Sequence, residues 1–408
     1  MFFYSFAPWV LFLIFVYIAY KKDLLKSFSG AFYVTVTFMI LPAGLFYAFG
    51  GERYYVPNED SIKWFNIYMS ILYVAMIAGL FVQYKVKQIF LERDFKLSEG
   101  FKNYTYIKWI SVIVFSVCFI YVITFADKIP LIQLVLGKTL QTSFSRPDVA
   151  GGIPFFYTFT IVANTVIPFF LILMLSKKNF FKVNNRTLLI VFTLMAVIFT
   201  SVALNKNTLF LIIIFFILYV IKSRKRFVYL FSAGFVFVVY YFATKVFFNA
   251  GENPYSAFTF VESILKRIFV TQGAGLTTRI EFEDRPLPDD TSIKRYIFER
   301  MYGKEGGSAP TIFFGDNIMT ESLLVTALLI IVVTLFFFAL AGMTDGLYQK
   351  SRKVEFLALG YVVFYGGHLL GISEVQSFGL RTLLPIALIA ALYLTDKLVD
   401  KTQLFNKN

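Results

Sequence analysis

The chain has 408 residues, of which 58% are hydrophobic and 20% aromatic, and it carries a formal net charge of +14. A soluble core of this length would need far fewer apolar side chains, so the composition favours a membrane protein. The single cysteine, Cys118, excludes a disulfide within the chain and a cysteine-based metal site.

Eleven apolar runs alternate with mostly short polar connections. Most reach the ~20 residues that an α-helix needs to cross a ~30 Å hydrocarbon layer. In chain order the runs are 3–20, 31–49, 65–84, 109–126, 155–175, 188–203, 208–221, 227–248, 322–342, 354–371 and 378–395. We therefore predict an all-α polytopic membrane protein with about 11 transmembrane helices and one integral membrane domain over residues 1–408. The first run ends at Lys21 without a small-residue cleavage site, so it is predicted to be a retained span.

The basic residues are sorted between the two sides of these predicted spans. If every second connection is cytoplasmic, that side holds 23 of the 39 Lys and Arg residues and 8 of the 25 acids, a net charge of +15 against −1 outside. The positive-inside rule then places the N-terminus on the outer side of the membrane and the C-terminus in the cytoplasm. Basic residues spread over membrane-proximal loops attract anionic lipid headgroups, so membrane lipids, and not nucleic acid, are the expected partners.

Three connections depart from a plain helix–loop–helix pattern. The connection 127–154 begins with an apolar stretch that is too short to span the membrane. The turn at 205–207 joins two rather short runs, so we expect it below the outer headgroup level. The segment 249–321 is predicted to be a large periplasmic loop, and its length marks it as a functional candidate.

The large loop contains two recognisable pieces. Residues 256–272 have apolar side chains at helical spacing, with Glu262, Lys266 and Arg267 on the other face, which predicts an amphipathic helix on the outer surface. Residues 306–322 are moderately apolar but are interrupted by Gly and Pro. Irregular backbone at membrane depth is tolerated only where protein or a water-filled cavity surrounds it, so this piece is expected to line a cavity.

Arginine is concentrated on the predicted outer side. Its planar guanidinium fits phosphate and carboxylate oxygens bidentately and stays charged. Arg146, Lys206 and Arg381 come from different parts of the chain and could converge at one depth, which would suit a lipid-linked diphosphate. Four further arginines could bind a glycan or could simply alternate with acids on a solvated face: Arg279, Arg285, Arg295 and Arg300.

Candidate proton carriers lie on the same side. His368 and Glu374 flank the short outer turn between the last two runs, and His titrates near neutrality. Asp316 follows Gly315 in the expected cavity liner and could either accept a proton or cap a helix. Glu305 and Glu321 are further candidates, although Glu321 opens a run and the helix dipole alone favours a carboxylate there. The sequence contains no phosphate-cradling P-loop, no H-E-x-x-H and no G-x-S-x-G.

The order of these features resembles the bacterial O-antigen polymerases, also called oligosaccharide repeat-unit polymerases. The likeness covers the number of spans, the basic residue in a central turn and the long late loop. It is local at 307–311 (Gly-Ser-Ala-Pro-Thr), at 377–381 (Ser-Phe-Gly-Leu-Arg) and at Ser145-Arg146 before Pro147. The chain departs from the family at Asn205-Lys206-Asn207, where relatives often show Gly-Thr-Arg or similar.

The resemblance implies a glycosyltransferase without metal or other cofactor in the bacterial inner membrane, working in O-antigen, lipopolysaccharide or capsule-type polysaccharide biosynthesis. It would join oligosaccharide repeat units carried on undecaprenyl diphosphate, and a chain-length regulator protein is a further expected partner. Arg146, Lys206 and Arg381 would hold the diphosphate, and His368, Asp316 or Glu374 would take the acceptor proton.

Two other functions remain open at this stage. An O-antigen ligase would share the architecture and the donor, but such ligases usually carry a His in the large outer loop, and 249–321 has none. A flippase or transporter for the same lipid would usually show internal repeats, and none is apparent.

Overall fold

A computed structural model describes most of the chain. The described residues are 2–52, 57–93, 100–101, 104–129, 132, 152–176, 185–202, 206–220, 228–229, 231–232, 234–235, 262, 265–266, 268–283, 287, 291–303, 309 and 311–405. Within them every regular element is helical, and eight helices are long and apolar enough to cross a membrane. The chain is thus an all-α, multi-pass membrane protein.

Ten of the eleven predicted runs coincide with helices of the structure. Eight are the candidate spans, and the runs 188–203 and 208–221 correspond to two shorter apolar helices. The run 227–248 lies largely outside the described residues, as does the connection 133–150. The prediction of 11 spans therefore stays a prediction.

The chain divides into two compact units. The first comprises residues 1–94, 254–349 and 366–379, and the second comprises 95–253, 350–365 and 380–408. Helix α18 (Val354–Ile372) contributes to both. The prediction of a single membrane domain is not tested by this division, because both units are built from apolar helices.

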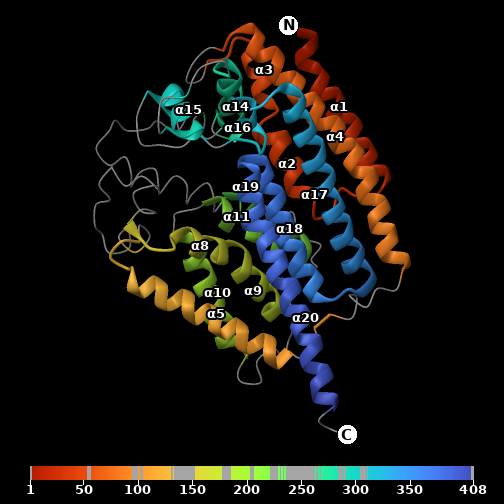
Figure 1. Cartoon of the computed structure of the whole chain (residues 1–408), viewed down its shortest axis with the longest axis vertical. Helices are drawn as coiled ribbons and strands as arrows, with labels where there is room; N and C mark the ends of the chain where they lie inside the picture. Colours follow the sequence, from red (N-terminus) through yellow and green to blue (C-terminus); the bar gives the residue numbers. More distant parts are fainter. Residues whose placement is uncertain are drawn as a thin grey trace. The chain divides into compact units, whose positions relative to one another are not determined.

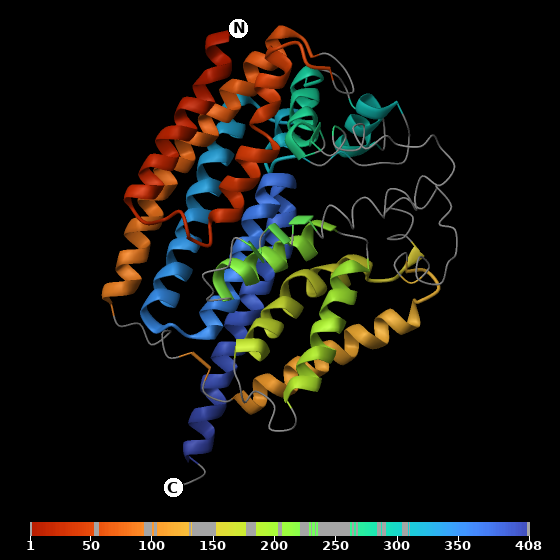
Figure 2. The same cartoon turned by 180° about the vertical axis from the view of Figure 1, so that it is seen from behind.

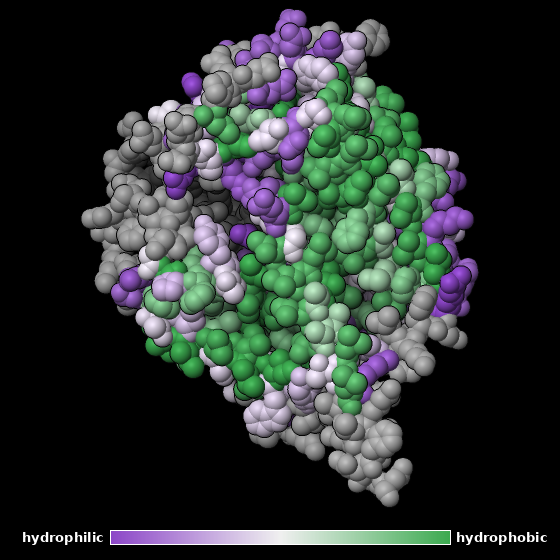
Figure 3. All heavy atoms as spheres, in the orientation of Figure 1, coloured by the Kyte–Doolittle hydropathy of each residue, from purple (hydrophilic) through white to green (hydrophobic). Residues whose placement is uncertain are grey.

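The first unit is a bundle of long helices with short helices at one end (Figures 1 and 2). Its elements are α1 (Phe2–Lys21), α2 (Gly30–Met39), α3 (Pro42–Ala48), α4 (Glu59–Glu92), α14 (Thr271–Glu281), α15 (Ile293–Tyr302), α16 (Gly315–Ile318), α17 (Leu323–Ser351), the end of α18, and α19 (Val375–Phe378). The surface over α1, α4 and α17 is predominantly hydrophobic, with hydrophilic residues gathered towards its ends (Figure 3). This is the pattern expected of helices that face lipid.

Local sequence explains where the helices of this unit begin and break. Asn58 caps α4, because its Oδ1 accepts a hydrogen bond from the Ser61 N–H at 2.7 Å. Pro42 stands at the first position of α3 and separates it from α2, since proline cannot continue a helix from α2. At the other end of α4, Lys22 lies over the rings of Phe81 and Tyr84, at 4.9 and 4.1 Å.

Glycines bring α4 and α17 into close contact. A Cβ on Gly342 would lie 2.5 Å from the Gln83 carbonyl oxygen, and one on Gly346 would lie 2.9 Å from that of Lys87. Such spacing of small residues is a common way for helices to pack within a membrane. Between the two glycines, the buried Asp345 accepts hydrogen bonds from the Phe28 N–H (3.2 Å) and the Gln83 amide (2.8 Å), so its polar atoms are satisfied within the protein.

The second unit contains α5 (Tyr104–Thr124), α8 (Phe156–Ile161), η2 (Val162–Val166), α9 (Ile167–Ser176), α10 (Asn185–Ser201), α11 (Lys206–Phe215), η3 (Phe216–Val220), the start of α18, most of η4 (Gly379–Leu383) and α20 (Leu384–Phe405). Aromatic rings fill its core: Phe115 meets Phe192 edge-on, and Tyr121 stacks on Phe159, each pair at 4.6 Å between centroids.

Among the described residues, three π-helical turns (η2, η3 and η4) interrupt these helices, and one has a clear cause. Pro168 has no N–H to give to the carbonyl of Asn164 four residues earlier. The Tyr361 hydroxyl donates to that carbonyl instead, at 2.9 Å. The wide turn η2 and the buried Tyr361 therefore compensate for a proline within a membrane helix.

Candidate functional site

The described helices of the loop 249–321 lie at one end of the first unit. Helix α14 packs against α2, α3 and α4, and α15 and α16 lie beside it (Figures 1 and 2). A Cβ on Gly273 would clash with the Ala43 side chain and lie 2.7 Å from the Ile40 carbonyl oxygen, so glycine is required for this approach. The Asn58 N–H donates to Glu281 at 3.0 Å, which ties α14 to the start of α4.

The predicted cavity liner is packed inside this end of the unit. Residues 311–315 are buried, and the Phe313 N–H donates to the Leu370 carbonyl of α18 at 3.0 Å. Irregular backbone here is thus surrounded by protein, whereas the sequence predicted that the segment 306–322 lines a cavity, and of this segment residues 318–322 do so. A Cβ on Gly315 would clash with the Thr311 side chain, so a glycine is also needed at the turn before Asp316.

Arg279 forms the centre of the site. Its side chain is fully buried, and its three nitrogens donate to Asp316 Oδ1 (Nε, 2.7 Å), the Gly275 carbonyl (Nη1, 2.9 Å) and the Ala309 carbonyl (Nη2, 2.8 Å). Burial lowers the pKa of this guanidinium, and the carboxylates of Asp316 and Glu374 oppose the shift. Because Arg stays protonated in proteins, the buried cation is balanced chiefly by Asp316.

A second ion pair completes the cluster. Lys294 of α15 pairs with Glu374, which also accepts a hydrogen bond from the Ser377 hydroxyl at 3.3 Å. Lys294 is linked to the liner as well, since its carbonyl accepts from the Ala309 N–H at 3.1 Å. We call Arg279, Asp316, Lys294 and Glu374 the charged cluster. Its carboxylates are partly exposed, 23% for Asp316 and 24% for Glu374, so they can be reached from outside the protein.

The structure places Arg279 differently from the sequence prediction. A glycan-binding arginine must present free donors, whereas Arg279 is buried and donates within the protein from Nε and both terminal nitrogens. We therefore assign it a positioning role towards Asp316. The alternative role of Asp316 as a helix cap is not observed either. No side chain caps α16, and the Asp316 carboxylate accepts a hydrogen bond from Arg279.

His368 is buried in α18 against α2. Its Nδ1 is 2.9 Å from the Thr35 hydroxyl oxygen, and among the described residues its buried Nε2 has no hydrogen-bond partner. The structure thus fixes one ring nitrogen of a predicted proton carrier and leaves the other unsatisfied.

The remaining candidates have separate positions. Arg295 and Arg300 are exposed on α15, where Arg300 lies over the rings of Phe282 and Tyr296, at 5.2 and 5.1 Å. Arg285 and Glu305 lie outside the described residues. Most of the amphipathic helix predicted over 256–272 does so too, although Glu262 and Lys266 pair at 2.7 Å with the expected helical spacing.

The two predicted diphosphate-binding residues that the structure describes belong to the second unit. Arg381 lies in the π-turn η4 and is partly exposed. Lys206 is the first residue of α11, and Arg146 lies outside the described residues. The catalytic and glycan-binding candidates that the structure describes belong to the first unit.

Sequence reasoning missed Lys294, and it missed Trp64 and Tyr68, which line a cavity together with residues 318–322 of the predicted cavity liner. This outer cavity, of about 310 Å³, is lined by Trp64, Tyr68, Glu283 and residues 318–323. Trp64 and Tyr68 lie one turn apart near the start of α4, a spacing that places them on one face, so the sequence did hold a signal. Among the described residues no group of three or more His, Cys, Asp or Glu side chains could hold a metal ion.

Comparisons of the chain with protein-family models, curated proteins and solved structures found no match.

Proposed function

We propose that the chain is a membrane glycosyltransferase that polymerises oligosaccharide repeat units carried on undecaprenyl diphosphate, at the periplasmic face of the bacterial inner membrane. The observation that carries the proposal is the charged cluster at the end of the first unit. It holds two partly exposed carboxylates in fixed positions beside two cations, where a membrane-bound sugar could reach them.

The cluster suits proton transfer from a sugar hydroxyl. Arg279 fixes Asp316 through a charge-assisted hydrogen bond, and the burial of Arg279 keeps that geometry rigid. A general base must be held within hydrogen-bond reach of the proton that it takes, and Asp316 combines a fixed position with exposure. Glu374 and His368 are the other two candidates for this role.

The reaction would proceed as a glycosyl transfer. The acceptor hydroxyl oxygen attacks the anomeric carbon of the donor sugar, its proton passes to a carboxylate, and the bond from that carbon to the diphosphate breaks. The leaving diphosphate gains negative charge, which fixed cations stabilise without reorganisation. Arg146, Lys206 and Arg381 are the residues proposed for that task.

The proposal is tested in cells that lack the chain. Loss of long-chain polysaccharide, with single repeat units still exported, is the expected result. The wild-type chain should restore the polymer, whereas Asp316→Asn at normal protein level should not. The matched control is Glu59→Gln, which changes an exposed acid in the first turn of α4.

Two other outcomes would contradict the proposal. Polymer that accumulates on the carrier lipid without reaching its final acceptor would indicate a ligase. Lipid-linked repeat units retained on the cytoplasmic face would indicate a flippase.

A further inference from the structure

The outer cavity combines aromatic and polar side chains. Trp64 and Tyr68 of α4 supply the aromatic part, and residues 318–323 supply most of the remaining lining. Its volume of about 310 Å³ lies at the small end of the roughly 300–1,000 Å³ that ligand pockets occupy. The cavity therefore suits a small ligand, or one unit of a longer ligand.

The aromatic part is a pair of neighbouring rings. Trp64 and Tyr68 lie one helical turn apart, with ring centroids 6.2 Å apart and ring planes at 42°. Tyr68 is buried and lies 6.0 Å from Phe314 between ring centroids, whereas Trp64 is partly exposed. The face of an aromatic ring is negative, so it attracts the C–H groups of a sugar, which the adjacent oxygens make slightly positive. Trp64 thus offers a surface for one face of a sugar ring.

The polar part is the exposed segment 320–322. The Thr320 hydroxyl donates to the Asp316 carbonyl at 3.5 Å, and the Ser322 hydroxyl accepts from a backbone N–H at the start of α17 at 3.4 Å, so both ends of the segment are held. Among the described residues, the Glu321 carboxylate takes part in no hydrogen bond or ion pair. An ionised carboxylate accepts hydrogen bonds, and the hydroxyls of a sugar supply the donors.

The charge of the lining disfavours an anion. No lysine or arginine lies among the described residues that line the cavity, so a phosphate would meet the Glu321 carboxylate without a lining cation to balance it. A small organic cation would use the carboxylate and a ring face but not the hydroxyls of Thr320 and Ser322. A neutral sugar ring, with C–H faces and a rim of hydroxyls, uses all of these groups.

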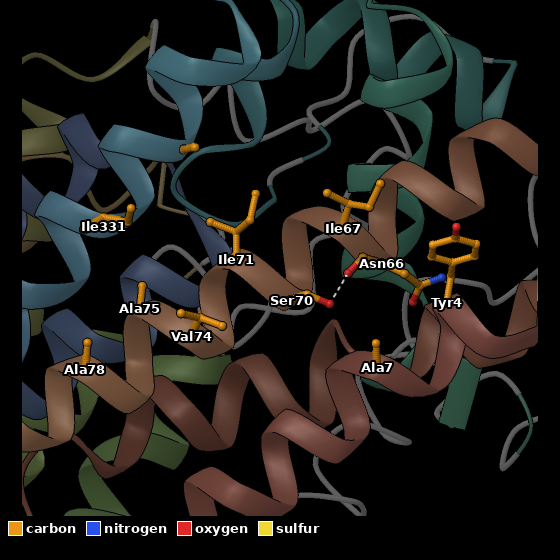
Figure 4. Close-up of a pocket in the computed structure, with 11 residues that line it drawn as sticks. Tyr4, Ala7, Asn66, Ile67, Ser70, Ile71, Val74, Ala75, Ala78 and Ile331 are labelled. Atoms are coloured by element: carbon orange, nitrogen blue, oxygen red, sulfur yellow. Dashed lines mark hydrogen bonds between the residues drawn. The ribbon is translucent and has the colours of Figure 1, made fainter.

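A second, larger groove of the first unit has a different chemistry. It has a volume of about 600 Å³ and lies among α1, α4 and α17, where Figure 4 shows Ala7 and Ala78 in its lining. Of the residues that line it, only Tyr4, Asn66 and Ser70 carry polar groups. This groove suits a hydrocarbon chain rather than a sugar, so it provides a control position for the experiment below.

We propose that the outer cavity binds one neutral sugar ring of the glycan, with a face of the ring against Trp64 and its hydroxyls donating to Glu321. The inference rests on the proposed function, which supplies the glycan. Helix α16 joins the cavity to the charged cluster, because it carries Asp316 and ends at Ile318, which lines the cavity. The bound ring is then a neighbour of the sugar that loses its proton to Asp316.

The experiment uses the purified full-length protein in detergent. The chain has three tryptophans, so Trp9→Phe with Trp109→Phe leaves Trp64 as the only one, and its fluorescence reports on the cavity. Methyl glycosides of glucose, galactose, mannose, rhamnose and N-acetylglucosamine are titrated separately, with choline and inorganic diphosphate as charged comparison ligands. We expect at least one glycoside to change the Trp64 emission saturably, with a Kd of about 1–10 mM, since one ring gains only a few hydrogen bonds and one aromatic contact.

Paired variants test the contacts, with binding measured by saturation-transfer NMR of the best glycoside. Trp64→Ala and Glu321→Gln should each weaken binding about tenfold, because one removes the aromatic face and the other removes the charged acceptor. The controls Trp109→Ala, at an exposed tryptophan of α5, and Glu59→Gln, in the first turn of α4, should bind like the wild type. Ala78→Phe, in the apolar groove, should also leave binding unchanged.

Three results would overturn the inference. They are no response to any glycoside, binding of choline or diphosphate as tight as that of the best glycoside, and unchanged binding by Trp64→Ala at matched elution from a sizing column. Glycoside binding needs no turnover, so failure of the proposed function is recognised separately, as sugar binding by a protein that makes no polymer. Polymer of normal length in cells that carry Trp64→Ala with Glu321→Gln would instead show that the glycan does not use the cavity.

Discussion

At the scale of single residues, the protein places a fully buried arginine at the end of a membrane bundle. Arg279 can be accommodated there only because Asp316 and two backbone carbonyls accept from it. Removal of the guanidinium would leave those acceptors without their donor, and two of them are carbonyls of the buried residues Gly275 and Ala309. Arg279 therefore stabilises the predicted cavity liner and also fixes the position of the Asp316 carboxylate.

We expect Arg279→Ala to lower the free energy of unfolding by about 3–5 kcal/mol, because it breaks a buried ion pair from one side. Arg295→Ala, an exposed substitution on the neighbouring helix α15, should change it by no more than about 0.5 kcal/mol. Chemical unfolding in detergent micelles measures both. Equal stability of the two variants would contradict the stabilising role assigned to Arg279.

Arg381 is predicted to act through its charge at the start of the last span. Arg381→Ala and Arg146→Ala should each abolish long-chain polysaccharide while protein levels stay near normal, because a charge at membrane depth is retained only where it has a partner or ligand. Arg381→Lys should restore the polymer only in part, since lysine lacks the bidentate fork. Chain length on a gel is the measurement, and normal polymer in both alanine variants would refute the role.

At the scale of elements, glycine decides how closely the helices of the first unit pack. Gly342 faces the backbone of Gln83, so Gly342→Ala should lower stability by about 1–3 kcal/mol through overpacking. Gly379→Ala is the matched control, because a Cβ there meets no atom within 4 Å. Thermal unfolding of both proteins in the same detergent checks this, and a Gly342→Ala variant as stable as the control would disprove the close contact.

The apolar runs predicted most helices but not their ends. The run 354–371 matches α18 almost residue for residue, whereas 65–84 became α4 over Glu59–Glu92. Hydropathy reports only the part of a helix that lies in hydrocarbon, and residues such as Glu59, Lys85 and Lys87 extend the helix beyond it because they are compatible with helical structure.

Sequence patterns predicted neither helix α14 nor the pairing within the charged cluster. Gly273 and Gly275 each disfavour a helix by about 1 kcal/mol, so 271–281 does not look helical by propensity. Tertiary packing of Gly273 against Ala43 overrides that preference. The ion pairs Arg279–Asp316 and Lys294–Glu374 join segments that are far apart in sequence. The spacing of residues within one segment cannot predict such contacts.

At the scale of the whole molecule, the distribution of charge predicts the orientation in the membrane. Within the first unit, the N-terminus, the start of α4 and the helices α14, α15 and α16 of the loop 249–321 lie at one end (Figures 1 and 2), while Lys22 packs near the other end of α4. This agrees with a single outer side for all three segments. The assignment of that side to the periplasm remains a prediction from the positive-inside rule.

Reporter fusions test this orientation. A reporter that is active only in the cytoplasm should give signal after Asn408 and none when inserted near Asp289. The same reporter in a chain truncated after Lys22 serves as an internal check and should be active. The opposite pattern would show that the predicted orientation is wrong and that the charged cluster lies at the cytoplasmic face.

The central claim is that the chain polymerises lipid-linked repeat units and that fixed cations, without a metal ion, compensate the leaving diphosphate. The most direct measurement gives purified protein undecaprenyl-diphosphate-linked repeat units in liposomes and follows product length with EDTA or with added magnesium. We predict a ladder of polymer of equal yield in both conditions, and its loss in Asp316→Asn. Absence of polymer under every condition, or polymer lost in EDTA and restored by one divalent ion, would contradict the account.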